Sequence, residues 1–314
     1  MRAVAAAAKR GPERICIVGG GLMGANIALV FAASGHEVTV FEPLPDSRAS
    51  LRDRVRESLE LIGGDLRAAD RIEAVGDLAL AVRGADYVTE AAPEKLPLKQ
   101  AIFADLVRLA PRDCILASNT SVIPIGRIAE GLGTRDRILG THWWNPAHLV
   151  PLVEVVQAQG TSDATVAATM DLLSRVGKAP AHVRKDTPGF VANRLQHALW
   201  REAIAMVAEG VCDAATLDSC VKNSFGLRLP VLGPLENADL VGLDLTLDIH
   251  EVIIPELDRH AGPNPYLRRK IEEGHLGFKT GEGFRAWTPD EMASLRGALV
   301  SHLLAAAGSR KPVR

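Results

Sequence analysis

Short apolar runs alternate with helix-period segments over the first half of the chain. The apolar runs have the length of buried strands, and the segments between them repeat apolar residues every three to four positions. The expected strands are Ile15–Val18, Glu37–Phe41, Tyr87–Glu90, Cys114–Ser118, Arg137–Thr141 and Leu152–Val156, and the expected helices are Leu22–Ser34, Asp46–Ile62 and Leu98–Leu109. This alternation predicts a parallel sheet, because each parallel connection has to cross back over the sheet.

The pattern becomes mainly helical after Thr187-Pro188-Gly189. An apolar stripe at helical spacing follows, formed by Leu195, Leu199, Ala203, Met206 and Val207. We therefore expect a flexible extension at 1–13, a doubly wound, Rossmann-type α/β domain at 14–187 and a smaller all-helical domain at 188–314. The stripe can bury a homodimer interface, or it can face the core of its own domain.

Composition narrows the class of protein. The 314 residues are 47% hydrophobic and carry a net charge of −2, which argues against disorder and against a protein that coats nucleic acid. The uncharged stretch 15–35 is long enough to span a membrane, but the glycines at 19, 20, 21 and 24 and the strand-like start favour a strand, a turn and a helix. Four scattered cysteines fit a reducing compartment. We expect a cytoplasmic protein with no membrane and no nucleic-acid partner.

A glycine-rich turn joins the first expected strand to the first expected helix. Residues 19–24, Gly-Gly-Gly-Leu-Met-Gly, contain the Gly-x-Gly-x-x-Gly pattern that lets a backbone approach a pyrophosphate at a helix N-terminus. Glu42 ends the second expected strand, where an acidic side chain can accept hydrogen bonds from the ribose and repel a 2′-phosphate. The pattern predicts NAD as the cofactor, held by Gly19, Gly21, Leu22, Met23, Gly24 and Glu42.

A histidine and a glutamate stand at the ends of neighbouring expected strands. An imidazole suits proton transfer near neutral pH, and a carboxylate partner fixes its tautomer and stabilises the imidazolium. His142 and Glu154 could therefore form the acid/base pair of a dehydrogenase. Their spacing is equally compatible with a packed histidine and an unrelated strand glutamate. The other histidines lack the spacing of metal ligands, so no metal is expected.

Seven motifs, from the glycine turn to a segment near the C-terminus, resemble the 3-hydroxyacyl-CoA dehydrogenase family in order and spacing. The resemblance runs from about Ile15 to Trp287. Besides the glycine turn, the motifs are Ser118-Asn119-Thr120-Ser121, His142-x-x-Asn145-Pro146, Leu152–Val155, Asp186–Phe190 with Asn193-Arg194, Gly233-Pro234-x-Glu236 and Lys279–Phe284.

The resemblance implies a role for each matching position. It makes His142 the catalytic base and Glu154 its partner, and it places Ser121 and Asn193 at the substrate oxygen and the histidine. It also implies that four further residues contact NAD, namely Glu94, Lys99, Asn145 and Lys279.

The positions that would contact the substrate depart from the acyl-CoA pattern. Ser58 fits a CoA-contacting serine, but the lysine that should follow is missing from 59–65. The segments 92–94, 149–154 and 225–228 resemble the branch that includes L-gulonate 3-dehydrogenase (lambda-crystallin) and carnitine dehydrogenase. Arg228 could then grip a substrate carboxylate, or it could be an exposed loop arginine.

Two tryptophans and one histidine follow the expected base closely in the sequence, and the pattern leaves their location in the fold undecided. Trp143-Trp144 could line the pocket for a compact or aromatic substrate, or pack in the core. His148 could line the mouth of the pocket, but we expect it at the surface. We expect a NAD-dependent dehydrogenase of a small hydroxy-carboxylate. The alternatives are a 3-hydroxyacyl-CoA dehydrogenase and a catalytically inert, crystallin-like NAD-binding protein.

Overall fold

A computed structural model describes residues 12–308. The expected extension at 1–13 therefore lies almost wholly outside the described residues. The chain divides into two compact units, one made of the described residues up to Asn193 together with those from Val300, the other of Arg194–Leu299. Each unit is described by itself below.

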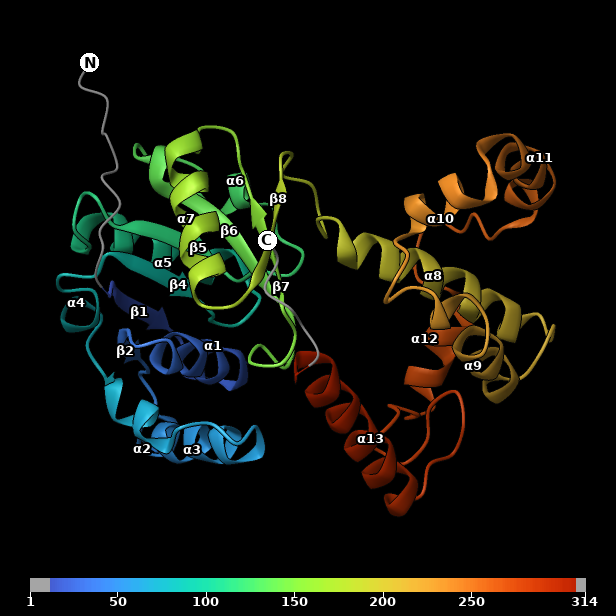
Figure 1. The fold of residues 1–314 in the computed structure, drawn as a ribbon, viewed down its shortest axis with the longest axis horizontal. Helices are drawn as coiled ribbons and strands as arrows, with labels where there is room; N and C mark the ends of the chain where they lie inside the picture. Colours follow the sequence, from blue (N-terminus) through green and yellow to red (C-terminus); the bar gives the residue numbers. More distant parts are fainter. Residues whose placement is uncertain (1–11, 309–314) are drawn as a thin grey trace. The chain divides into compact units, whose positions relative to one another are not determined.

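The first unit is built on one eight-stranded sheet with the order β3-β2-β1-β4-β5-β6-β7-β8 (Figure 1). Six strands, β1 to β6, run parallel, as the sequence pattern predicts for most of the sheet. The strands are β1 (Arg14–Val18), β2 (Glu37–Phe41), β3 (Ile72–Val75), β4 (Tyr87–Glu90), β5 (Ile115–Ser118), β6 (Ile138–Trp143), β7 (Leu152–Val156) and β8 (Ala179–Val183).

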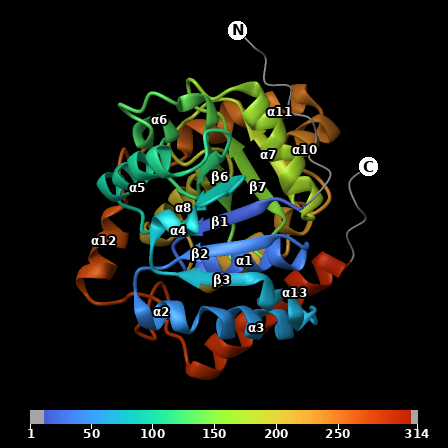
Figure 2. The same ribbon diagram turned by 90° about the vertical axis from the view of Figure 1, so that its left-hand side faces the viewer.

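Helices cover both faces of this sheet, as Figure 2 shows. Strand β1 sends Ile15 and Ile17 into one buried cluster and Cys16 and Val18 into the other, because successive side chains of a strand point to opposite faces. The first cluster is closed by α1 (Leu22–Ala33), α3 (Leu51–Leu61) and α7 (Asp163–Arg175), the second by α4 (Leu78–Ala81), α5 (Leu96–Leu109) and α6 (Ile125–Ile128).

Strand β7 has the opposite direction to its neighbour. It pairs antiparallel with β6, and β8 is parallel to β7. Only residues 144–151 connect β6 to β7, whereas a parallel crossover takes roughly a dozen residues or more. The sequence pattern had assigned no direction to this strand, and the reversal places β6 and β7 side by side in register.

Several elements differ from the sequence expectation in detail. Strands β3 and β8 were not expected, and β8 is mostly exposed, so it lacks the apolar run that marks a buried strand. The expected helix 46–62 is split into α2 (Pro45–Ala49) and α3. In the helical half of the chain, Gly242, whose φ is 105°, separates α10 from α11. Short 3-10 helices lie at Leu66–Arg71, Arg135–Arg137, Phe225–Leu227 and Ile254–Glu256.

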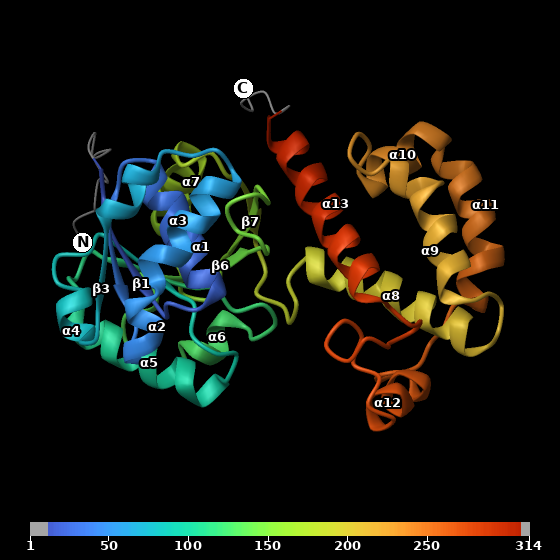
Figure 3. The same ribbon diagram turned by 90° about the horizontal axis from the view of Figure 1, so that it is seen from below.

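The second unit consists of helices joined by loops, apart from isolated bridges around Glu282 (Figure 3). Ala205 is its one buried hydrophobic residue within 194–299. The helices of this half of the chain are α8 (Ala192–Ala208), α9 (Ala214–Lys222), α10 (Pro234–Val241), α11 (Leu243–Ile253), α12 (Pro265–Glu272) and α13 (Pro289–Gly308). No helix within 12–308 is both long and apolar enough to cross a membrane.

Substitution of Gly24 by alanine is expected to destabilise the first unit, because a Cβ there would lie 1.8 Å from the carbonyl oxygen of Gly19. Such a clash forces the turn and α1 apart, which lowers the free energy of unfolding by about 1–3 kcal/mol or more. Gly21→Ala is the matched control, since its Cβ would meet nothing within 4 Å. Thermal unfolding should show a lower Tm for Gly24→Ala alone, and equal Tm values would contradict this packing.

Candidate active site

The candidate site lies at the carboxyl edge of the sheet. The glycine turn follows β1, Glu42 follows β2, and Glu90 and Ser118 end β4 and β5. Because β1, β2, β4, β5 and β6 are parallel, their carboxyl ends meet at one edge, where doubly wound sheets bind ligands. His142 stands one residue before the end of β6, so it belongs to the same edge.

The glycine turn is shaped to let a ligand approach the start of α1. Gly19 has a φ of 104°, a conformation that favours glycine, and Gly24 packs directly against it. Gly21 precedes α1 and leaves open space where a side chain would be, while Leu22 is 65% exposed. No side chain caps the first N–H groups of α1, so they are available to a pyrophosphate.

Glu42 is buried beside this turn and holds it in place. Its Oε2 accepts a hydrogen bond from the Gly20 N–H at 2.9 Å, and its Oε1 accepts one from the Leu44 N–H at 3.0 Å. An ionised carboxylate has about four acceptor positions, so capacity remains for the two hydroxyls of a ribose. The negative charge would repel a 2′-phosphate. The turn and Glu42 together therefore fit NAD.

His142 and Glu154 form a buried pair across the antiparallel strands β6 and β7. The two residues are directly opposite each other in the register, and His142 Nδ1 lies 2.8 Å from Glu154 Oε2. His142 is 4% exposed and Glu154 is 1% exposed. The strand reversal that the sequence did not predict is thus what brings the two expected residues together.

Glu154 also binds the backbone at the start of α8. Its Oε1 accepts hydrogen bonds from the N–H groups of Val191 at 2.9 Å and Ala192 at 3.1 Å. Burial raises the pKa of the Glu154 carboxyl, but the hydrogen bonds from His142, Ala192 and Val191 outweigh burial and leave the pKa below its ordinary value. Glu154 is therefore ionised, so Nδ1 of His142 carries a proton and Nε2 is free to accept one.

Two aromatic rings flank the imidazole of His142. The ring centroid of Trp144 is 5.3 Å away and that of Phe190 is 5.7 Å away. Phe190 is buried with a φ of 49°, the one positive value among the described non-glycine residues. Such a conformation is costly for a large side chain, and here it leads into the Val191 and Ala192 N–H groups that bind Glu154.

A second buried ion pair stands where β4 ends. Lys99 Nζ donates to Glu90 Oε1 at 2.7 Å and to the Ala92 carbonyl at 3.1 Å, and the Ser118 hydroxyl donates to Glu90 Oε2 at 2.6 Å. Lys99 is 1% exposed and Glu90 is fully buried. The structure thus directs Lys99 to protein acceptors, and its expected contact with NAD stays a prediction. Sequence reasoning missed Glu90 as a partner, although its place at a strand end was a usable signal.

Glu94 organises the loop that carries Ser121. Its Oε1 accepts hydrogen bonds from the Thr120 hydroxyl at 2.6 Å and from the N–H groups of Ser121 and Val122. Burial raises the pKa of the Glu94 carboxyl, but these hydrogen bonds and the charge of Lys99 outweigh burial and lower the pKa. The partly buried Asn193 donates through Nδ2 to the Ser121 carbonyl at 3.1 Å, which brings these two expected residues together.

Other expected residues are exposed or partly exposed. Asn145 is exposed in the connection between β6 and β7, and Met23 is partly exposed in the first turn of α1. Arg228 and Lys279 belong to the second unit, where both are exposed. The described residues contain no group of three side chains placed to hold a metal ion.

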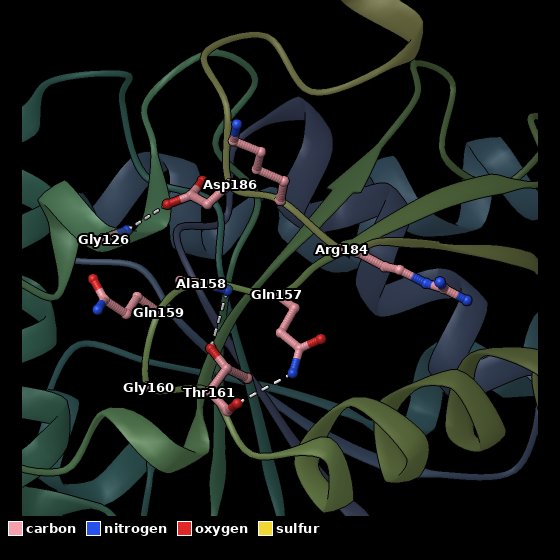
Figure 4. A pocket seen from close by; sticks show the side chains of 9 residues that line it. Gly126, Gln157, Ala158, Gln159, Gly160, Thr161, Arg184 and Asp186 are labelled. Atoms are coloured by element: carbon pink, nitrogen blue, oxygen red, sulfur yellow. Dashed lines mark hydrogen bonds between the residues drawn. The ribbon is translucent and has the colours of Figure 1, made fainter.

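A separate hollow of about 620 Å³ lies beside the carboxyl ends of β7 and β8 (Figure 4). There the Thr161 hydroxyl donates to the Ile138 carbonyl at 2.5 Å, at the amino end of β6 and therefore away from the end that carries His142. Asp186 points to the start of α6 and accepts from the Ile125 and Gly126 N–H groups, while Arg184 points away (Figure 4). Asp186 of the Asp186–Phe190 motif thus has a structural role here.

Known proteins match both units. The model of the 3-hydroxyacyl-CoA dehydrogenase NAD binding domain matches residues 14–187, and that of the C-terminal domain matches 189–287. The 5-formyl-3-hydroxy-2-methylpyridine 4-carboxylate 5-dehydrogenase of Mesorhizobium japonicum is 34% identical over 93% of this chain and 96% of its own length. A solved structure of an enzyme of this kind, described as a NAD+ dependent dismutase, has a TM-score of 0.88 at 31% identity, covering 96% of this chain and 100% of that one.

Two further relatives act on different kinds of substrate. The 3-hydroxybutyryl-CoA dehydrogenase of Mycobacterium tuberculosis is 39% identical over 87% of this chain and 97% of its own length. The L-carnitine dehydrogenase of Streptomyces griseus is 37% identical over 73% of this chain and 70% of its own length. With both family models matched in order, this chain belongs to the 3-hydroxyacyl-CoA dehydrogenase family and is a NAD-dependent dehydrogenase acting on CH–OH groups.

Proposed function

We propose that this dehydrogenase oxidises a small hydroxy-carboxylate, or the hydrate of a formyl-carboxylate, with His142 as the base. The observation that carries the proposal is the buried His142–Glu154 pair at the sheet edge that also presents the glycine turn. NAD, when bound, supplies the acceptor for the hydride that leaves the substrate carbon. Nε2 of His142 takes the hydroxyl proton, and the ionised Glu154 stabilises the imidazolium that results. In the reverse direction His142 returns the proton to the alkoxide.

Ser121 and Asn193 are proposed to orient the substrate oxygen toward His142. The support is their mutual contact and the ordered loop beneath Ser121, which Glu94 holds through three hydrogen bonds. For the cofactor, Glu42 is proposed to bind the adenosine ribose. Glu94, Lys99, Asn145 and Lys279 are proposed to complete the NAD site.

The small substrate is favoured over a CoA thioester by three observations. Residues 59–65 lack the lysine expected for CoA, and the hydroxyl of Ser58 is bound to the Arg54 carbonyl at 3.0 Å. Arg228 is exposed and offers a planar group that binds a carboxylate through two hydrogen bonds. The relative from Mesorhizobium japonicum is named for a pyridine carboxylate. The alternative is a 3-hydroxyacyl-CoA substrate, supported by the relative named for 3-hydroxybutyryl-CoA.

A second copy of the chain is the proposed partner of the helical unit. Large apolar side chains are exposed on α8, α10 and α11, and apolar side chains grouped on one surface mark sites that another protein covers. Examples with their exposed fractions are Leu195 58%, Leu235 79%, Leu240 71%, Leu243 64% and Val252 70%. We further propose a reducing compartment, the cytoplasm, for a chain whose four cysteines are unpaired.

Substitution of His142 by glutamine is expected to lower kcat by about 10²–10⁴-fold, because the proton acceptor is lost while the ring's neighbours stay in place. NADH absorbance measures the rate, and quenching of protein fluorescence measures NAD binding, which should be unchanged. His182→Gln, at an exposed position on β8, is the control. Near-normal kcat in the His142 variant would refute the assignment of the base.

Arg228→Ala is expected to lower kcat/KM for free acids by roughly 10–100-fold, because a charge-assisted hydrogen bond to a carboxylate is lost. The screen uses L-carnitine, 5-formyl-3-hydroxy-2-methylpyridine-4-carboxylate and 3-hydroxybutyryl-CoA, with NADH absorbance as the readout. Arg268→Ala, another exposed arginine of the same unit, is the control. Wild-type turnover of the thioester alone would reject the small-acid proposal, and equal loss in both variants would reject the role of Arg228.

The dimer predicts a solution mass of twice the 33.5 kDa chain in sedimentation velocity. Leu247→Asp on α11 is expected to shift the protein toward the monomer, because it places a charge in an apolar interface. His250→Asp introduces the same side chain at an exposed polar position of that helix and should leave the mass unchanged. A wild-type monomer at micromolar concentration would exclude the dimer.

A further inference from the structure

Three polar atoms in the connection between β6 and β7 have no partner. The indole Nε1 of Trp144 and both ring nitrogens of His148 are buried, yet none has a hydrogen-bond partner among residues 12–308. The two side chains themselves are only partly buried. Buried donors and acceptors are ordinarily satisfied, so three unsatisfied ones in a single connection call for an explanation, and a bound ligand is one.

Position distinguishes Trp144 from its neighbour Trp143. The Trp143 indole also has an unpartnered Nε1, but it is 2% exposed and enclosed by the Phe31 ring at 5.8 Å and by Lys178 Nζ at 5.4 Å. Trp144 instead packs on the imidazole of His142. Trp143 therefore belongs to the core, whereas the Trp144 ring lies against the imidazole of the proposed base. His148 is not the plain surface residue that the sequence suggested.

The connection is held in a fixed shape. Lys178 Nζ donates to the carbonyls of Ala147 and Val150, the latter at 3.1 Å, and the N–H groups of Leu149 and Val150 both donate to the Pro146 carbonyl. A recognition group on a held backbone loses little freedom when a ligand binds, which favours affinity and selectivity. Lys178 thereby positions the segment that carries Trp144 and His148.

The unpartnered atoms define the chemistry of the ligand. An indole N–H only donates, so it requires an acceptor such as a carboxylate, phenolate or carbonyl oxygen. Burial, and then the charge of Lys178, lower the pKa of His148, so its neutral ring offers one donor and one acceptor. A compact acid with a neighbouring hydroxyl presents both kinds of group within reach of one segment, and its charged carboxylate is a stronger acceptor than the neutral carbonyl of a thioester.

We propose that Trp144 and His148 are specificity-determining residues that bind the polar group next to the reacting carbon of a small hydroxy- or formyl-carboxylate. This inference rests on the proposed function and deepens it, because it names the groups that separate such substrates from acyl thioesters. The Trp144 N–H donates to the carboxylate or ring oxygen of the substrate. The imidazole of His148 pairs with the adjacent hydroxyl or oxygen.

Tryptophan signals test the contact directly. The chain has four tryptophans, so a ¹H–¹⁵N spectrum of the ¹⁵N-labelled full chain shows four indole signals, assigned by single Trp→Phe variants. The spectrum is recorded without added cofactor, so that the ligand binds but is not turned over. Addition of 5-formyl-3-hydroxy-2-methylpyridine-4-carboxylate should move the Trp144 proton signal downfield and slow its exchange, and should leave Trp143 unmoved. An unchanged Trp144 signal at saturating ligand overturns the proposal.

Kinetics of matched variants complete the test. Trp144→Phe and His148→Phe should each raise the KM of the small acid by about tenfold and leave the KM of NAD unchanged, since each loses polar contacts and keeps a ring. Trp143→Phe removes the enclosed N–H and should behave as wild type. Equal KM values for the Trp143 and Trp144 variants overturn the proposal while the proposed function stands.

A failure of the proposed substrate class can be distinguished from a failure of the role proposed for Trp144. If wild type accepts 3-hydroxybutyryl-CoA and rejects every small acid, the proposed substrate class falls. The indole titration is then repeated with that thioester. A Trp144 response transfers its recognition role to the thioester carbonyl, and a silent Trp144 removes the role altogether.

Discussion

The carboxylate of Glu154 is the group on which the arrangement of the site depends. It is buried, ionised and satisfied by three donors: the imidazole of His142 and two backbone N–H groups at the start of α8. A buried charge is tolerated only when it is paired and hydrogen-bonded, so these partners must stay in place together. One side chain thus ties β7, β6 and the first turn of α8 to each other, and it sets the tautomer of the base at the same time.

Carboxylates that accept hydrogen bonds from backbone N–H groups recur around the α/β unit. Where a strand ends and irregular backbone begins, N–H groups no longer bind a neighbouring strand, and one acidic side chain accepts hydrogen bonds from two of them. Three carboxylates each accept hydrogen bonds from two backbone N–H groups. Glu42 accepts from Gly20 and Leu44, Glu94 from Ser121 and Val122, and Asp186 from Ile125 and Gly126. Much of the acidic content of this nearly neutral chain is therefore structural, and the loops it fixes are the ones that carry the candidate functional residues.

Periodicity and motif spacing predicted the doubly wound sheet and the glycine turn, whereas the His142–Glu154 pair was favoured only by the family resemblance. The apolar pattern assigned no direction to β7, because strand polarity follows from the length of the connection and not from that pattern. The partners of Lys99 could not be predicted from the sequence either, because a lysine on a helix is ordinarily expected to be exposed. Its burial follows from the approach of Glu90, a contact that spans β4 and α5 and leaves no periodic signal. Strand β8 was missed because most of it is exposed.

Glu42 has a consequence for attempts to change the cofactor preference of this enzyme. Rational conversion from NAD to NADP usually replaces the acidic side chain at this position with a small or basic one. Here that exchange would also strip the Gly20 and Leu44 N–H groups of their acceptor and loosen the turn that faces the pyrophosphate. With the role proposed for Glu42, one residue governs both cofactor selectivity and the shape of the glycine turn, so an engineered switch would require a second substitution that restores those two hydrogen bonds.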